Sequence, residues 1–268
     1  MLRKRLTTIL AILPLLVAAV WFEEPLPWFT VFIAIWAVLA ALEFYRLVGA
    51  SKALPLAGFG AIWTLLFVIS PHFDYAYTNL LLLGSALVLP LGWFMLRRRR
   101  EKTFLSWVWT IAGIIYIGWL FSHFVSLRGL DSGRDWVFFA LFTTFASDSA
   151  AFFIGRAWGR HSLAPAVSPA KTWEGAVGGV FGAIIIGSFI VMLLELPVSY
   201  AQAIPLALAV SIFGQVGDLL ESWFKRNMGA KDSGKAMPGH GGFLDRMDSV
   251  VLAGVVVYYY VILFNPGG

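Results

Sequence analysis

Apolar residues follow one another along this chain in long runs, which short polar segments separate. The hydrocarbon core of a bilayer is about 30 Å thick, so a spanning helix needs about 20 mostly apolar residues. Nine runs approach this length, and we therefore predict an all-α polytopic membrane protein with about nine transmembrane helices. The predicted spans are Leu6–Phe22, Leu26–Val48, Leu54–Ser70, Tyr77–Leu96, Phe104–Leu127, Trp136–Ile154, Trp173–Leu194, Ala203–Leu220 and Val250–Phe264.

The composition supports a membrane protein. Of the 268 residues 59% are apolar and 13% charged, whereas soluble domains have about 45–50% apolar and about 25% charged residues. This balance excludes a soluble domain, a disordered chain and a nucleic-acid-binding module, so we expect a lipid bilayer and no nucleic acid as partner. The absence of cysteine excludes disulfides, cysteine-ligated zinc, iron–sulfur clusters and thiol catalysis.

The distribution of cations predicts the orientation. With nine spans and a cytoplasmic N-terminus, only Arg128 and Arg134 of the 20 Lys and Arg residues fall outside, as the positive-inside rule requires. The run Arg97–Arg100 is then an anchor at anionic lipid head groups. The first span could be a cleaved signal peptide, but residues 21–24 offer no small-residue cleavage site, which favours a retained helix.

The polar residues suggest an organisation in two parts within one folding unit. We expect residues 1–130 to form a transmembrane scaffold of about five helices. Residues 131–268 would form a catalytic half with cytoplasmic loops at 155–173 and 223–247. In the scaffold, Glu43 is interpreted as an interfacial residue or a partner of Arg46.

Small residues in the seventh span recur at every fourth position, at Gly175, Gly179, Ala183 and Gly187. This spacing lets helices approach closely, and we interpret it as a packing stripe without a cofactor role. The stripe also makes a homodimer plausible.

Carboxylates gather near the predicted cytoplasmic ends of three spans. Because ionisable residues inside a membrane are costly, each needs a function or a partner. After Asp218, a helix would place Glu221, Ser222 and Lys225 on the same face. The remaining acids are Asp148, Asp245 and Asp248. Internal salt bridges, such as Asp218 with Lys225 or Asp248 with Arg246, are the structural alternative.

The two loops add cations and glycines to these acids. Ser168–Thr172 with Lys171 predicts a rigid turn into a helix N-terminus, a good environment for phosphate. The glycines of Pro238–Gly242 permit close backbone approach to a ligand, although the P-loop spacing is absent. His240 could donate to phosphate or organise the loop. Carboxylates beside cations suit Mg²⁺ and phosphates, and thus phosphoryl or nucleotidyl transfer. The four histidines lack zinc-ligand spacing.

The sequence from residue 222 to residue 248 resembles the signature of the phosphatidate cytidylyltransferase (CDP-diacylglycerol synthase) family. The match comprises Ser222-Trp-Phe-Lys225-Arg226, Lys231-Asp232, and Pro238-Gly-His240-Gly-Gly-Phe-Leu-Asp245-Arg246-Met-Asp248. The upstream segments 147–156 and 168–175 are also similar to the family. Met237, Ser149 and Phe152 depart mildly from its usual residues, whereas every charged position of the signature is present.

The resemblance implies that CTP and phosphatidate react to CDP-diacylglycerol and pyrophosphate, with Mg²⁺ and a further K⁺ as a candidate. It assigns the metal to Asp218 and Asp245, with Asp248 as another acidic position of the motif. It also implies the inner membrane if the source is bacterial.

Together these arguments give a set of candidate site residues. The catalytic candidates are Asp218, Asp245, Lys225 and Asp248. Asp148 and Asp248 are further metal candidates beside Asp218 and Asp245. The candidates for binding substrate phosphates are Arg156, Lys171, Ser222, Arg226, Lys231, His240 and Arg246.

Two alternatives remain open. Another CTP-using membrane enzyme, such as a polyprenol kinase or an archaeal-lipid cytidylyltransferase, would share the acids and cations. A cation-coupled transporter could use Asp148 and Asp218 as ion sites, but it would leave the basic, glycine-rich loop without a function.

Overall fold

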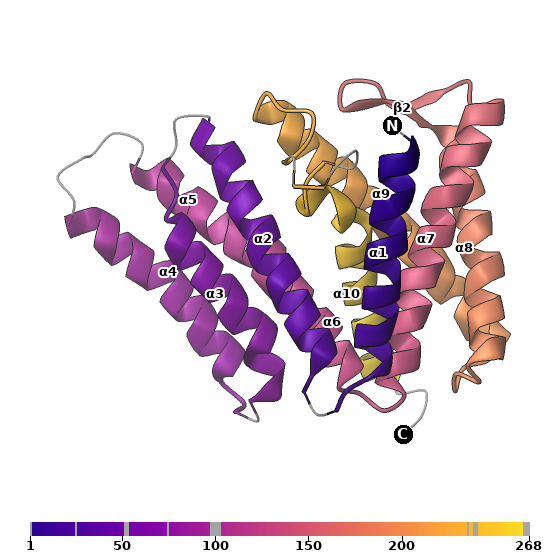
Figure 1. Cartoon of the computed structure of the whole chain (residues 1–268), viewed down its shortest axis with the longest axis horizontal. Coiled ribbons are helices and arrows are strands. Elements are labelled where there is room, and N and C mark those ends of the chain that lie inside the picture. Colours follow the sequence, from indigo (N-terminus) through magenta and orange to yellow (C-terminus); the bar gives the residue numbers. More distant parts are fainter. Residues whose placement is uncertain are drawn as a thin grey trace. The chain divides into compact units, whose positions relative to one another are not determined.

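The computed structural model describes residues 2–24, 26–50, 54–73, 75–96, 103–234, 236–237 and 241–264, without the side chains of residues 2–11. Nearly all of this chain is helical (Figure 1). The chain folds into two compact units. The first unit comprises Met1–Val125 and Met228–Arg246, and the second comprises Ser126–Asn227 and Met247–Gly268.

The first unit holds the N-terminal helices and one later segment of the chain. Helix α2 contacts α1, α3 and α5, and α4 contacts α3 and α5. The segment 228–246 ends in a 3₁₀ turn, η3, which packs against α2. The elements are α1 (Leu2–Trp21), α2 (Trp28–Ala50), α3 (Ala57–Ile69), η1 (Ser70–His72), α4 (Thr78–Leu96), α5 (Thr103–Gly113), the π-helical η2 (Ile114–Trp119), α6 (Leu120–Arg128), whose last residues enter the second unit, and η3 (Leu244–Arg246).

Tyr45 fixes α2 within the first unit. Its ring fills the space above Gly60 of α3 and Gly113 of α5, where any added Cβ would collide with it. The Tyr45 hydroxyl donates a hydrogen bond of 2.8 Å to the carbonyl oxygen of Thr110. Glycine on both neighbours therefore lets a large side chain connect three helices, two residues after Glu43.

The second unit combines four helices with a β-hairpin. Helix α7 contacts α8, α9 and α10, and α9 contacts both α8 and α10. Two antiparallel strands connect α7 to α8, and Ser162 pairs with Thr172. The elements are α7 (Gly133–Trp158), β1 (Ser162–Ala164), β2 (Ser168–Thr172), α8 (Trp173–Leu193), α9 (Tyr200–Asn227) and α10 (Asp248–Phe264).

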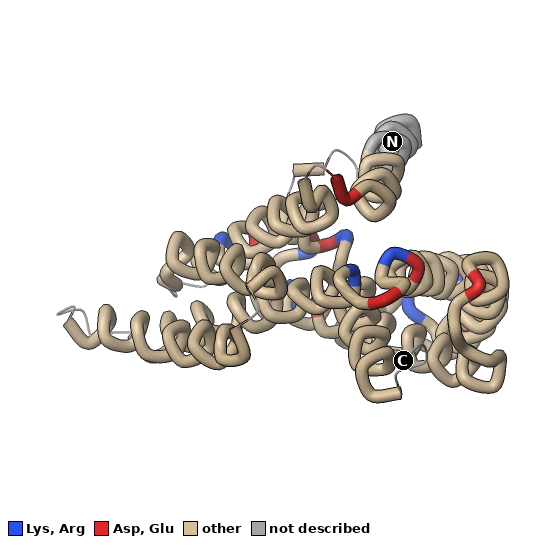
Figure 2. Tube along the Cα trace, turned by 90° about the horizontal axis from the view of Figure 1, so that it is seen from below, with Lys and Arg blue, Asp and Glu red and all other residues tan. Residues whose placement is uncertain are grey.

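The helices confirm an integral, multi-pass membrane protein. Each of the nine predicted runs is helical over most of its length. In the described chain six helices are long and apolar enough to cross a membrane, and three further apolar helices, Ile12–Trp21, Ala57–His72 and Asp248–Phe264, are shorter. Most of the tube is free of charged residues (Figure 2).

The structure differs from the expected loops in two respects. Helix α7 continues to Trp158 and α9 to Asn227, so both loops begin later than predicted. The segment Ser168–Thr172, expected as a rigid turn, is a strand, and Thr172 ends it by capping α8: its hydroxyl accepts a hydrogen bond of 3.1 Å from the backbone N–H of Gly175. The periodicity of apolar residues could not predict the longer helix ends or the strand, because both are formed largely by polar residues.

The small-residue stripe of α8 packs within the chain, as predicted. Gly175, Gly179, Ala183 and Gly187 are buried. A Cβ added to Gly179 would lie 3.0 Å from the carbonyl oxygen of Ser147 in α7 and 3.1 Å from Nε2 of Gln215 in α9. Because neighbouring helices of the same unit cover the stripe, it no longer argues for a homodimer.

We predict that Gly179→Leu destabilises the protein. The new side chain must push α7 or α9 aside, and overpacking of this kind costs about 1–3 kcal/mol. Thermal unfolding in detergent, followed by size-exclusion chromatography, should show a lower midpoint than for the wild type. Phe181→Leu on the exposed face of the same helix is the control. Equal midpoints for both variants would contradict close packing at Gly179.

Candidate active site

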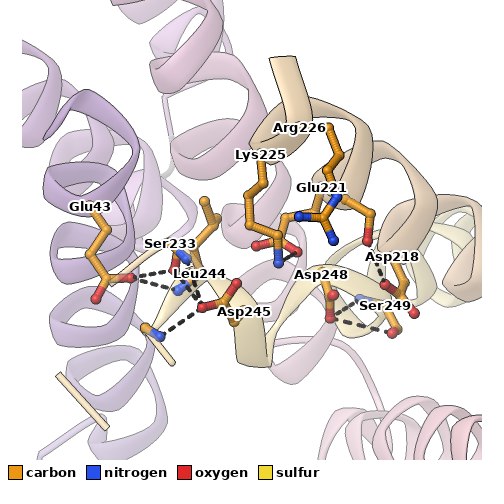
Figure 3. Close-up of polar contacts among 12 residues, drawn as sticks. Glu43, Asp218, Glu221, Lys225, Arg226, Ser233, Leu244, Asp245, Asp248 and Ser249 are labelled. Carbon is orange, nitrogen blue, oxygen red and sulfur yellow. Dashed lines mark hydrogen bonds and ion pairs between the residues drawn. The ribbon is translucent and has the colours of Figure 1, made fainter. Parts of the chain in front are cut away.

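Helix α9 carries an acidic and basic face in the second unit. Asp218, Glu221, Ser222 and Lys225 follow at helical spacing, as the sequence predicts. The Glu221 side chain is fully buried, and its Oε2 lies 2.7 Å from Nζ of Lys225 (Figure 3). The ion pair between Asp218 and Lys225, which the sequence analysis gave as an alternative to a functional role, does not form. Lys225 pairs with Glu221.

Asp218 instead pairs with Lys171 of strand β2. Its Oδ2 lies 2.5 Å from Nζ of Lys171, and both side chains retain partial exposure, 33% and 25%. The hydroxyl of Ser222, one turn further along α9, donates a long hydrogen bond of 3.4 Å to Oδ1 of Asp218. A partly exposed ion pair with short contact is one that an incoming charged ligand can reach.

Hydrogen bonds fix the hairpin that carries Lys171 both at its turn and just before strand β1. Nε of Arg226 donates to the carbonyl oxygen of Val167 at 3.3 Å. The Glu174 carboxylate accepts hydrogen bonds from the backbone N–H groups of Arg160 and His161, and Nδ1 of His161 lies 2.6 Å from its Oε1. These contacts hold β1 and β2 to α8 and α9, and so place the Lys171 ammonium at Asp218.

Asp148 and Asp248 complete a cluster with Asp218. The Asp148 carboxylate interacts electrostatically with Asp218 and Lys171 and accepts a hydrogen bond from the Ser249 side chain. Oδ1 of Asp248 accepts a hydrogen bond of 2.9 Å from the backbone N–H of Ser249 (Figure 3). Asp248 also interacts with the charges of its carboxylate neighbours. We call this set the acidic cluster: Asp148, Asp218, Glu221 and Asp248, together with Lys171 and Lys225.

Asp245 lies in the first unit, where it organises the segment that precedes it. Its Oδ2 accepts three hydrogen bonds: from the backbone N–H of Ser233 at 2.9 Å, from the Ser233 hydroxyl at 2.9 Å, and from the backbone N–H of Gly242 at 2.7 Å. One carboxylate oxygen thus connects Ser233 with Gly242, and Figure 3 shows the Asp245 side chain beside Ser233.

Glu43 belongs to the same network, and the interpretation of it as an interfacial residue or a partner of Arg46 is wrong. Its side chain is buried, and Oε2 accepts hydrogen bonds from the Ser233 hydroxyl at 3.0 Å and the backbone N–H of Leu244 at 3.1 Å. One signal could have revealed it: a carboxylate in an apolar helix is by default a functional candidate.

The remaining predicted residues divide between the two units. Arg156 and Arg226 are exposed at the ends of α7 and α9 in the second unit. Lys231 and Arg246 are exposed in the first unit. His240 lies outside the described residues. The structure therefore brings together Asp148, Asp218, Asp248, Lys171, Ser222 and Lys225, and separately joins Asp245 to Glu43.

Comparison with known proteins identifies the family. The chain matches the model of the Cytidylyltransferase family over residues 3–264. The chain belongs to this family. The chain is similar to the phosphatidate cytidylyltransferases of Bacillus subtilis, with 40% identity over 152 residues and 56% of each chain, and of Brucella suis, with 43% identity over 157 residues and 58% of each chain. The match therefore spans little more than half the length of these two relatives.

A longer match extends to the phosphatidate cytidylyltransferase of Staphylococcus saprophyticus. Identity is 33% over 201 residues, which cover 74% of this chain and 76% of the relative. The match therefore reaches beyond the C-terminal signature.

The oxygen donors of the acidic cluster are of the chemical type that divalent metals prefer. In the described part of the chain no three acidic or histidine side chains are close enough to hold a metal by themselves. Mg²⁺, however, usually takes one or two carboxylates and completes its shell with water and substrate phosphates. Four carboxylates against two ammonium groups provide hard oxygen ligands and, when ionised, an excess of negative charge.

We predict that Lys225→Met strongly destabilises the protein. Removing the ammonium group leaves the Glu221 carboxylate buried without this partner, and breaking a buried ion pair costs about 3–5 kcal/mol. Adding Glu221→Gln to Lys225→Met should restore part of the loss. Thermal unfolding in detergent measures both variants, with Lys231→Met at an exposed position as control. A single variant as stable as the wild type would contradict the pair's structural importance.

Proposed function

We propose that this cytidylyltransferase transfers CMP from CTP to phosphatidate, which gives CDP-diacylglycerol and pyrophosphate for phospholipid synthesis. The observation that carries the proposal is the acidic cluster, in which four carboxylates meet two lysines in a unit of predominantly apolar helices. Gathering so many carboxylates in a membrane protein is costly, and binding a metal with phosphates offsets that cost. The relatives carry the name of the same activity.

In this proposal Asp218 and Asp245 are ligands of Mg²⁺ because the family signature implies this role for each of them, and Asp148 and Asp248 are further ligand candidates. When bound, Mg²⁺ would neutralise the charge that develops on the transferred and leaving phosphates. The fit of Asp218 rests on its partial exposure and its carboxylate neighbours. Asp245 already accepts three hydrogen bonds at Oδ2, so this oxygen is oriented by the protein. A K⁺ beside Mg²⁺ is part of the proposal.

The reaction is an in-line displacement at phosphorus. A phosphate oxygen of phosphatidate forms a bond to the α-phosphorus of CTP, and the bond from the α-phosphorus to the oxygen that bridges to the β-phosphate breaks. Pyrophosphate leaves with that oxygen. Because the attacking phosphate is already anionic, no dedicated general base is required.

Basic side chains bind the phosphates in this reaction. Lys171 is the best placed because it is partly exposed and already at Asp218. A substrate phosphate that binds Lys171 would replace the Asp218 carboxylate as its partner. Ser222 and the exposed Arg156, Arg226, Lys231 and Arg246 are further contacts for CTP or the lipid head group, together with Lys225 and His240.

The membrane arrangement is part of the same proposal. All nine apolar helices, including the three shorter ones, would cross the bilayer, with the N-terminus and the active site on the cytoplasmic face. The distribution of Lys and Arg supports this orientation. The bacterial relatives support the bacterial inner membrane as the location. A homodimer remains an expectation.

We predict that Asp218→Asn and Asp245→Asn each abolish turnover because each removes a negative charge from a ligand of the metal. Purified protein with labelled CTP, phosphatidate and Mg²⁺ should yield labelled CDP-lipid and pyrophosphate for the wild type and the control variant, but not for Asp218→Asn or Asp245→Asn. Asp131→Asn, at an exposed acid between α6 and α7, is the matched control. Substantial activity of purified Asp218→Asn would refute the assignment, and phospho-lipid with CDP as products would favour a lipid kinase.

We also predict that activity requires a divalent cation. Chelation with EDTA should stop the formation of CDP-lipid, because the carboxylates alone repel the triphosphate, and added Mg²⁺ should restore it. Product formation that continues at the same rate in excess EDTA would contradict a metal at the acidic cluster.

A further inference from the structure

One face of helix α2 contacts Ser233 and residues 242–246 of the first unit. Trp36 and Glu43 are seven residues apart, which is close to two helical turns, so they share this face. Nε1 of Trp36 donates a hydrogen bond of 3.0 Å to the carbonyl oxygen of Phe243, and the two rings meet edge to face at 5.1 Å. Glu43 contacts the same segment at Ser233 and Leu244.

Glu43 and Asp245 share the single proton of one hydroxyl group, that of Ser233. Oγ of Ser233 lies 3.0 Å from Oε2 of Glu43 and 2.9 Å from Oδ2 of Asp245. All three side chains are buried, with relative exposures of 4%, 6% and 9% for Glu43, Ser233 and Asp245. A shift of Glu43 therefore changes the hydrogen bonding of Asp245 through a single intervening residue.

Glycines let the segment approach the Glu43 carboxylate. A Cβ at Gly234 would collide with Oε1 of Glu43, and one at Gly242 would collide with Oε2 of Glu43 and the Ser233 hydroxyl. Gly241 has a backbone φ angle of +87°, a value that residues other than glycine rarely adopt. Packing against Glu43 thus explains Gly234 and Gly242, whereas a Cβ at Gly241 would collide with Oδ2 of Asp245.

We propose that Glu43 is a positioning residue of the active site: from helix α2 it holds Ser233–Arg246, and through Ser233 it orients the carboxylate of Asp245. This inference rests on the proposed function for the role of Asp245. Glu43 itself does not touch the reacting groups in this scheme. Helix α2 is a suitable support because Tyr45, two residues further along, connects it to α3 and α5. Ligand-orienting partners of this kind typically affect activity about 10- to 100-fold.

Backbone hydrogen exchange of the substrate-free full chain in detergent tests the inference without relying on activity. The N–H of Leu244 donates to Glu43, and those of Ser233 and Gly242 donate to Asp245. Glu43→Ala should therefore speed up exchange in peptides from 228–246, while peptides from α9 keep their wild-type rates. Glu43→Gln retains an acceptor oxygen and should keep most of the protection.

Two further variants separate positioning from general loss of stability. Ser233→Ala removes the shared hydroxyl without touching α2, and it should also speed up exchange around Gly242. Thr30→Val is the matched control: Thr30 is buried in α2, but it bonds to Nε2 of His72 and not to the segment. If Glu43→Ala does not fold, Ser233→Ala and Glu43→Gln still carry the test.

Turnover gives the second readout. Glu43→Ala should lower kcat about 10- to 100-fold with little change in the KM for CTP, and Glu43→Gln should recover most of the activity. Unchanged exchange in 228–246, or an increase no larger than that of Thr30→Val, would overturn the inference. If exchange responds as expected but the wild type makes no CDP-lipid, the proposed function fails while the structural coupling of Glu43 to Asp245 stands.

Discussion

The cost of burying carboxylates in an apolar chain determines most of this structure. Each buried acid is stabilised by a specific donor: Glu221 by Lys225, Asp245 by Ser233 and Gly242, and Glu43 by Ser233 and Leu244. The contacts of Glu43 and Asp245 position Ser233, Gly242 and Leu244, and the pair of Asp218 with Lys171 positions the hairpin in the same way. Apolar packing alone would not fix the positions of the hairpin and of the Ser233–Arg246 segment.

Most helices could be predicted from the sequence because an apolar run of bilayer length has few alternatives to a transmembrane helix. The acids of α9 were found because their spacing matches a helix, and Asp148 and Asp248 because charges in membrane spans are rare. Ion-pair partners were not predictable in the same way. Lys225 could reach either Asp218 or Glu221 along the helix, and only the position of Lys171 on β2 decides between them.

Glu43 shows where local reasoning stops. Arg46 is close in sequence, so a local ion pair is the natural inference, whereas the actual donors come from residues 233 and 244. The same limit applies to the glycines near residue 240. Their number indicates close approach, but the group they approach includes a carboxylate of a distant helix. Tertiary hydrogen bonds of this range leave no periodic pattern along a chain.

The distance between Glu43 and its donors has a consequence for biosynthesis. Ser233 and Leu244 follow Glu43 by 190 and 201 residues, so α2 is synthesised well before either donor exists. The carboxylate must therefore remain hydrated or protonated while the next helices are added. The first unit reaches its final hydrogen bonding only after α9 has been made. Glu43 helps to position residues of the mature protein, but during most of translation its carboxyl group makes the membrane insertion of α2 less favourable.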